Sequence, residues 1–149
     1  MKKILLVLMS CVLGISVLIG CTKKQDTETK TKETLEENKL QGSPIDRLKE
    51  EFKKAGFKIG DNEMLAYDMI GATSGEKFKV NDQLIEVYYY DSSKLTEDGK
   101  KYLKEAETGS INFSGINIPV KYNKTGLVLA RHDEHKEQEK IVKIFNSFK

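Results

Sequence analysis

An uncharged run over residues 4–20, with Lys2 and Lys3 before it and Cys21 after it, constrains this chain more than any other feature. A secretory signal needs a basic start, an apolar stretch and small residues at the cleavage site. The two lysines, the run and Gly20 supply these parts in that order. An uncleaved transmembrane anchor is the alternative, because the run is as long as the shortest spanning helices, about 17 residues. In both cases the rest of the chain is expected outside the cytoplasm.

The tetrapeptide Leu18-Ile19-Gly20-Cys21 resembles the lipobox of bacterial lipoproteins. The resemblance implies that diacylglycerol is attached to the Cys21 sulfur and that the chain is cleaved after Gly20, so that residues 1–20 form the signal peptide. A thiolate forms a thioether readily, whereas serine or alanine at this position would not. The acyl chains, palmitate among them, would insert into the bilayer at about 0.8 kcal/mol per buried methylene. We therefore expect a lipid-anchored protein on the outer face of the cytoplasmic membrane.

Cysteine usage and charge exclude several classes of function. Once residues 1–20 are removed, Cys21 is the only cysteine, so no thiol remains for a disulfide, a metal site or nucleophilic catalysis. Without Lys2 and Lys3 the 25 basic residues become 23, which equals the number of acidic residues. A nucleic-acid partner needs a basic excess. The mature chain is thus expected to bind no nucleic acid and to carry no cofactor besides its covalent lipid.

The chain after Cys21 divides into a polar tether and one domain. Residues 21–43 are rich in Thr, Lys and Glu and hold few apolar side chains, so they are expected to remain disordered. About 20 such residues have a root-mean-square reach of about 25 Å. Residues 44–149 have the length of a single domain with its own core.

The domain reads as an α+β fold. Ser43, Pro44 and Asp46 mark a helix start, and Asn81-Asp82 suits a hairpin turn between two strands. We expect an antiparallel sheet of about four to five strands with helices packed mainly on one face. Residues 77–107 and 116–148 suggest a repeated hairpin-helix unit. The expected helices are 44–55, 63–70, 96–107 and 134–148, and the expected strands are 77–80, 84–90, 111–113, 116–122 and 127–131.

Two clusters are candidates for catalytic or ligand chemistry. The chain's two histidines, His132 and His135, flank Asp133 and Glu134, and imidazole and carboxylate groups bind divalent zinc or copper. The alternative interpretation of His132, Asp133 and His135 is a solvated helix start capped by Asp133. Residues 71–77 contain two glycines and a lysine, but the glycine spacing is one residue short of a phosphate-binding loop. A turn that ends a helix is the simpler interpretation of that segment.

Tyrosines provide the best candidate for a contact surface. Along the strand predicted over residues 84–90, Glu86, Tyr88 and Tyr90 point to the same side. If no helix covers that side, they form an exposed stripe suited to protein or glycan contact, because tyrosine combines a large ring with a polar hydroxyl. The alternative is that the aromatic rings pack beneath a helix.

The domain also carries a broader resemblance. The motifs Gly71-Ala72-x-x-Gly75-x-Lys77-Phe78 and Glu86-Val87-Tyr88-x-Tyr90-Asp91, between a capped helix and a C-terminal amphipathic helix, resemble those of small uncharacterised lipoproteins of low-GC Gram-positive bacteria. The resemblance implies no activity. We therefore expect a non-enzymatic binding module with an envelope or extracellular protein partner. The alternatives are a small envelope metal-dependent hydrolase that uses His132 and His135, and a receptor for a small solute.

Overall fold

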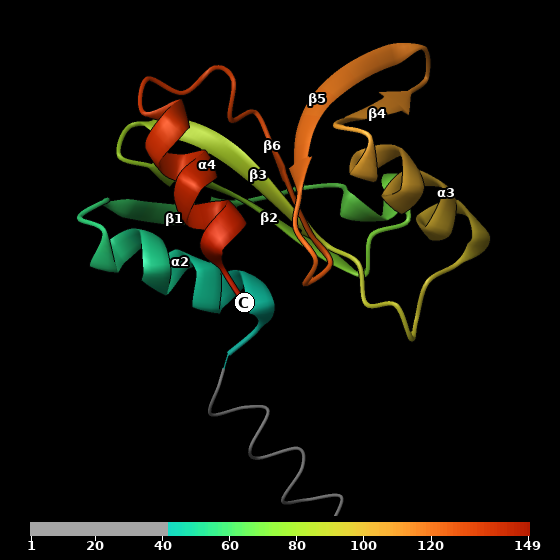
Figure 1. Ribbon diagram of the computed structural model, residues 1–149, viewed down its shortest axis with the longest axis horizontal. Helices are drawn as coiled ribbons and strands as arrows, with labels where there is room; N and C mark the ends of the chain where they lie inside the picture. Colours follow the sequence, from blue (N-terminus) through green and yellow to red (C-terminus); the bar gives the residue numbers. More distant parts are fainter. Residues whose placement is uncertain (1–41) are drawn as a thin grey trace, which may run out of the picture.

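The computed structural model describes residues 42–149. Three α-helices, one short 3-10 helix and six strands follow one another in this part of the chain (Figure 1). In chain order they are α2 (Pro44–Lys54), β1 (Ile59–Glu63), η1 (Tyr67–Ile70), β2 (Ser74–Val80), β3 (Gln83–Tyr89), α3 (Glu97–Glu107), β4 (Ser110–Phe113), β5 (Ile116–Tyr122), β6 (Leu127–Ala130) and α4 (Gln138–Ser147).

The six strands form one antiparallel sheet in the order β1-β2-β3-β6-β5-β4. Each half of the sheet is a run of hairpins, and β6 joins the halves by pairing with β3. Asn81 adopts a φ of 53° in the predicted turn between β2 and β3, a conformation that asparagine tolerates better than most residues. The prediction of an antiparallel α+β fold is confirmed, whereas the expected number of strands was too low.

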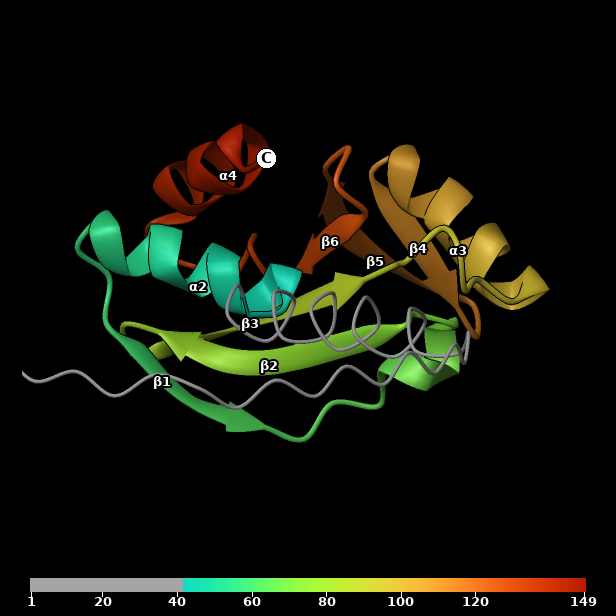
Figure 2. The same ribbon diagram turned by 90° about the horizontal axis from the view of Figure 1, so that it is seen from below.

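One face of the sheet is covered by α2 and α4. The predicted helix start at Ser43 and Pro44 is confirmed. The Ser43 hydroxyl accepts from the Asp46 amide, and the Asp46 carboxylate accepts from the Ser43 amide, so the two residues form a capping box. Leu48 and Phe52 of α2 pack with Phe145 of α4 against the strands. Figure 2 shows both helices on the same side of β2 and β3. The C-terminus lies beside the start of α2, where the Arg47 guanidinium lies 5.5 Å from the Phe148 ring centroid.

The opposite face is covered by α3 and η1, but only in part. Val128 and Ala130 of β6 point to this face and pack with Ala106 of α3 and Ile111 of β4. Two of the three α-helices within residues 42–149, α2 and α4, thus lie on one face, and α3 lies on the other. The structure does not support the repeated hairpin-helix unit, because the main strand contacts of α3 are with β4 and β5 and not with the hairpin that precedes it.

Two segments differ from the elements expected from the pattern. Residues 59–63 form an edge strand, β1, and only residues 67–70 of the predicted helix 63–70 are helical, as a 3-10 turn. The last helix begins at Gln138 and not at Glu134, because residues 131–137 form successive turns. The physical reason is His135, whose side chain is hydrogen-bonded to the Val80 carbonyl oxygen at the end of β2.

The predicted signal peptide 1–20, Cys21 and most of the predicted tether 21–43 lie outside the described residues. Within residues 42–149, no helix has the length and apolar character needed to cross a membrane. The anchor therefore stays a prediction from the sequence.

Candidate interaction surface

The predicted tyrosine stripe lies on β3, on the sheet face that α3 partly covers. Alternation along β3 directs Glu86 and Tyr88 to this face, while Ile85 and Val87 contact the core beneath α2 and α4. Tyr90 follows the end of the strand on the same side. The structure thus brings the three predicted residues onto one face but gives them different surroundings.

Tyr90 is a core residue. Its side chain packs with Ala106 and Val128, and the residue is only 2 % exposed. Its hydroxyl donates a hydrogen bond of 3.1 Å to the Ile70 carbonyl oxygen. Burial raises the pKa of the Tyr90 hydroxyl above its ordinary value. The prediction of an exposed stripe is therefore wrong at Tyr90, where the alternative interpretation of a packed aromatic ring applies.

Tyr88 and Glu86 remain accessible. Both are half-buried, and the Tyr88 hydroxyl donates a hydrogen bond of 2.8 Å to Glu86 Oε2. Burial, together with the negative charge of Glu86, raises the pKa of the Tyr88 hydroxyl. The hydroxyl stays protonated, so it acts as a donor that holds the carboxylate in place. Glu86 Oε1 has no hydrogen-bond partner among residues 42–149, so it is available to a partner.

Glu86 and Tyr88 belong to a larger uncovered area on β2 and β3. The helix α3 contacts β4, β5 and η1, so no α-helix within residues 42–149 covers this half of the sheet face, although η1 contacts β2 (Figure 1). We call this area the open face. It consists of Lys77, Lys79, Leu84, Glu86 and Tyr88.

The strand register arranges the charges of the open face. Lys77 lies directly opposite Glu86, and Lys79 lies opposite Leu84. Opposite charges across a strand pair attract each other. On its other side, Lys77 Nζ lies 3.7 Å from the Glu63 carboxylate on β1. The open face therefore presents positive and negative charges around one aromatic ring.

In the predicted histidine cluster, the His135 side chain has a structural role. His135 Nε2 donates to the Val80 carbonyl oxygen at 3.0 Å, and its Nδ1 accepts from the Glu137 amide at 3.0 Å. Both ring nitrogens are thus used, and the imidazole fastens the turns before α4 to the end of β2. His135 is 5 % exposed.

His132 is also buried, at 3 % exposure. Its Nδ1 lies 3.4 Å from Gln138 Nε2, and its Nε2 has no hydrogen-bond partner among the described residues. Asp133 is exposed. Across residues 42–149, no group of three or more His, Cys, Asp or Glu side chains is placed to hold a metal ion. The predicted convergence of His132, Asp133 and His135 on one metal is therefore not found in the described part of the chain.

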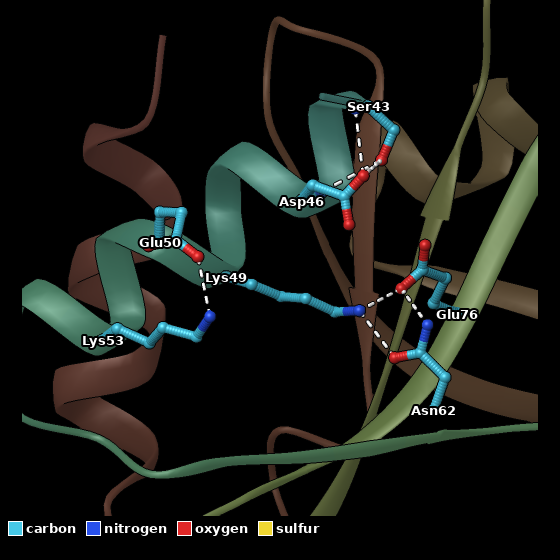
Figure 3. Close-up of polar contacts among 7 residues, drawn as sticks. All are labelled: Ser43, Asp46, Lys49, Glu50, Lys53, Asn62 and Glu76. Carbon is cyan, nitrogen blue, oxygen red and sulfur yellow. Dashed lines mark hydrogen bonds and ion pairs between the residues drawn. The ribbon is translucent and has the colours of Figure 1, made fainter. Parts of the chain in front are cut away.

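A polar triangle that the sequence analysis missed joins α2 to the edge of the sheet (Figure 3). Lys49 Nζ donates to Asn62 Oδ1 at 2.6 Å and forms an ion pair with Glu76, while Asn62 Nδ2 donates to Glu76 Oε2 at 2.9 Å. The same ammonium lies 4.6 Å from the Phe78 ring centroid. A lysine four residues after Ile45, on the apolar side of α2, was the available signal.

The triangle joins α2 to β1 and β2, and its contacts leave Lys49 little capacity to react. The Lys49 side chain is 10 % exposed, and its ammonium already has two oxygen partners and an aromatic face. An ammonium group held by these contacts is already engaged, so Lys49 is not a free nucleophile. We assign the triangle to the stability of α2 on β1 and β2.

The fold and the open face define a class: a small antiparallel α+β domain with an uncovered, charge-patterned half of its sheet. Comparisons with protein-family models, curated proteins and solved structures found no match to this chain. The resemblance to small lipoproteins therefore stays a prediction from the sequence.

Proposed function

We propose that this chain is a lipid-anchored protein of the outer face of the cytoplasmic membrane, and that its domain binds an envelope or extracellular protein without catalysing a reaction. The open face supports this proposal most directly. It places the Glu86 carboxylate and the Tyr88 ring side by side on a half of the sheet that no α-helix within residues 42–149 covers. The membrane location rests on the lipobox-like sequence that ends at Cys21.

The open face has the chemistry of a reversible contact. A tyrosine ring offers contact area with little loss of rotamer freedom, and its hydroxyl keeps a polar partner. Lys79 is exposed and makes no ion pair among the described residues, so it is free to pair with an acidic group of the partner. Charges at such a rim guide association and select the partner more than they add affinity.

The test of the binding surface is site-specific photo-crosslinking in intact cells. A photoreactive amino acid replaces Lys79 on the open face or, as the matched control, Lys100 on the exposed side of α3. We expect a discrete adduct with a second protein from position 79 and none from position 100. Equal labelling from both positions, or none from position 79, would overturn the proposed surface.

The anchor is tested separately. We expect labelled palmitate to enter the natural chain and to be lost from the Cys21→Ser variant, which would also remain unprocessed. Equal incorporation into both chains would overturn the proposed lipid site. Fractionation of the cells then reports whether the protein leaves the membrane fraction.

A further inference from the structure

A groove runs between α4 and the uncovered side of β5, with a volume of about 770 Å³. The α4 side supplies Gln138, Glu139, Val142, Lys143 and Asn146, and the β5 side supplies Lys121. The groove is shallow and largely open to solvent. The groove lies on the sheet face opposite the open face.

The strand register explains why Lys121 points into the groove. Val120 and Tyr122 pair with Ala130 and Val128 and point to the core beneath α3. Lys121 therefore projects to the other side, where α4 packs. Because α4 covers β6 and not the whole of β5, the lysine is exposed there.

Lys121 and Lys143 give the groove a local positive charge. Within residues 42–149, neither ammonium has a carboxylate within ion-pair distance. Glu139 is the one carboxylate in the lining, and its charge opposes that of the lysines. A site of this kind attracts anions even when the whole domain is near neutral, because the field depends on where the charges lie.

The lining selects among anionic partners. Val142 is the one apolar side chain in it, whereas peptide partners bind tightly through aromatic or aliphatic anchors that need apolar pockets. Lysine is a common phosphate ligand that acts as a point charge and imposes no particular geometry on the anion. We propose that this groove binds a linear, hydrophilic, phosphate-bearing polyanion, with phosphate groups held between Lys121 and Lys143.

His132 provides a built-in reporter for this proposal. It lies beside Gln138, which lines the groove together with Lys121. A phosphate at Lys121 would change the ring resonances of His132. His135 is the internal control, because both of its ring nitrogens are bonded to the backbone.

The experiment titrates inorganic tripolyphosphate into the full-length chain in a zwitterionic detergent, with ¹⁵N-labelled histidine and no histidine tag. We expect a saturable change in the His132 resonances and a smaller one at His135. Lys121→Gln together with Lys143→Gln should weaken binding about tenfold. Glu139→Gln should tighten it. The matched control replaces Lys53 and Lys54 on α2 by glutamine, which removes the same charge and should leave the affinity unchanged.

Four results would overturn the proposal. They are no saturable change at His132, equal weakening in the α2 control, equal or tighter binding of hexaglutamate, and binding of anionic phospholipid vesicles without binding of tripolyphosphate. The third would indicate an acidic peptide site, and the fourth would indicate a bilayer-binding surface. None of these results bears on the open face, because the groove lies on the other side of the sheet.

Discussion

Gly99, in the first turn of α3, lies directly against Gly71, which ends η1. A Cβ atom on Gly99 would lie 2.5 Å from the Gly71 carbonyl oxygen, and one on Gly71 would lie 2.4 Å from the Gly99 amide nitrogen. Because neither residue has a side chain, the helix and the turn approach each other closely. The Tyr90 hydroxyl bonds to the neighbouring Ile70 carbonyl and adds a polar link. Together these contacts fix how α3 docks on the sheet.

Gly99→Ala should therefore destabilise the domain, although alanine is the better helix former by about 1 kcal/mol. The added methyl group meets backbone atoms that have no freedom to rotate away. Overpacking of this kind costs about 1–3 kcal/mol, and we expect a net loss of about 2 kcal/mol in the free energy of unfolding. Urea unfolding followed by circular dichroism measures it. Lys100→Ala, on the exposed side of the same helix, is the control and should change stability by less than about 0.5 kcal/mol.

The Lys49–Glu76 pair should be strongly coupled. Replacing Glu76 by alanine leaves the ammonium of Lys49, whose side chain is 10 % exposed, with only Asn62 as its oxygen partner. Removing one partner of a largely buried pair costs about 3 kcal/mol, whereas replacing both by apolar groups costs less. We therefore expect Lys49→Met combined with Glu76→Leu to be more stable than Glu76→Ala alone.

A double-mutant cycle on urea unfolding measures this coupling. The matched control is the exposed pair of Lys53 and Glu50, whose side chains are 52 % and 58 % exposed. Exposed pairs contribute about 0–1 kcal/mol. Additive effects at Lys49 and Glu76 would contradict the assignment of the triangle to stability.

His132 should make the domain less stable as the pH falls. Burial lowers the pKa of the His132 imidazole below its ordinary value of 6.5, and the positive charge of Lys121 adds to this effect against the opposing charge of Asp133. The unfolded chain therefore takes up a proton at pH values at which the folded chain does not. The stabilisation that His132 contributes is therefore fully present at pH values above 6.5, the ordinary pKa of histidine. It is lost as the pH falls from 6.5 toward the lowered pKa of the folded chain.

His132→Leu removes both the titration and the unpaired Nε2 atom. We expect the melting temperature of this variant to vary less with pH than that of the natural chain between about pH 7.5 and about pH 5. The measurement is calorimetric unfolding across that range. An unchanged slope would show that other groups account for the pH dependence.

Local patterns predicted the parts of the fold that local contacts stabilise. The cap formed by Ser43 and Asp46, the turn at Asn81 and the helix that follows Thr96 all appear where the sequence indicated. The edge strand β1 was missed because Gly60, Asp61 and Asn62 are poor strand formers. Its conformation comes from pairing with β2.

Distant contacts decided the remaining features. The late start of α4 depends on the bond from His135 to Val80, which are 55 residues apart. The difference between Tyr88 and Tyr90 depends on where α3 and η1 pack, which alternation along one strand does not specify. The pattern therefore identified the correct face of β3 but not the part of it that stays open.

The open face should lose its partner when its charges are reversed. Glu86→Lys places a second positive charge opposite Lys77, and Lys79→Glu reverses the exposed cation that is free to meet the partner. Like charges brought together at an interface cost several kcal/mol and slow association. We expect either variant to reduce partner capture in the photo-crosslinking experiment, with the photoreactive group then placed at Leu84 in all chains.

Glu97→Lys on α3, where the side chain is 89 % exposed, is the charge-matched control and should leave capture unchanged. Circular dichroism checks that each variant is folded, and full capture by folded Glu86→Lys and Lys79→Glu chains would show that the contact does not depend on these two charges.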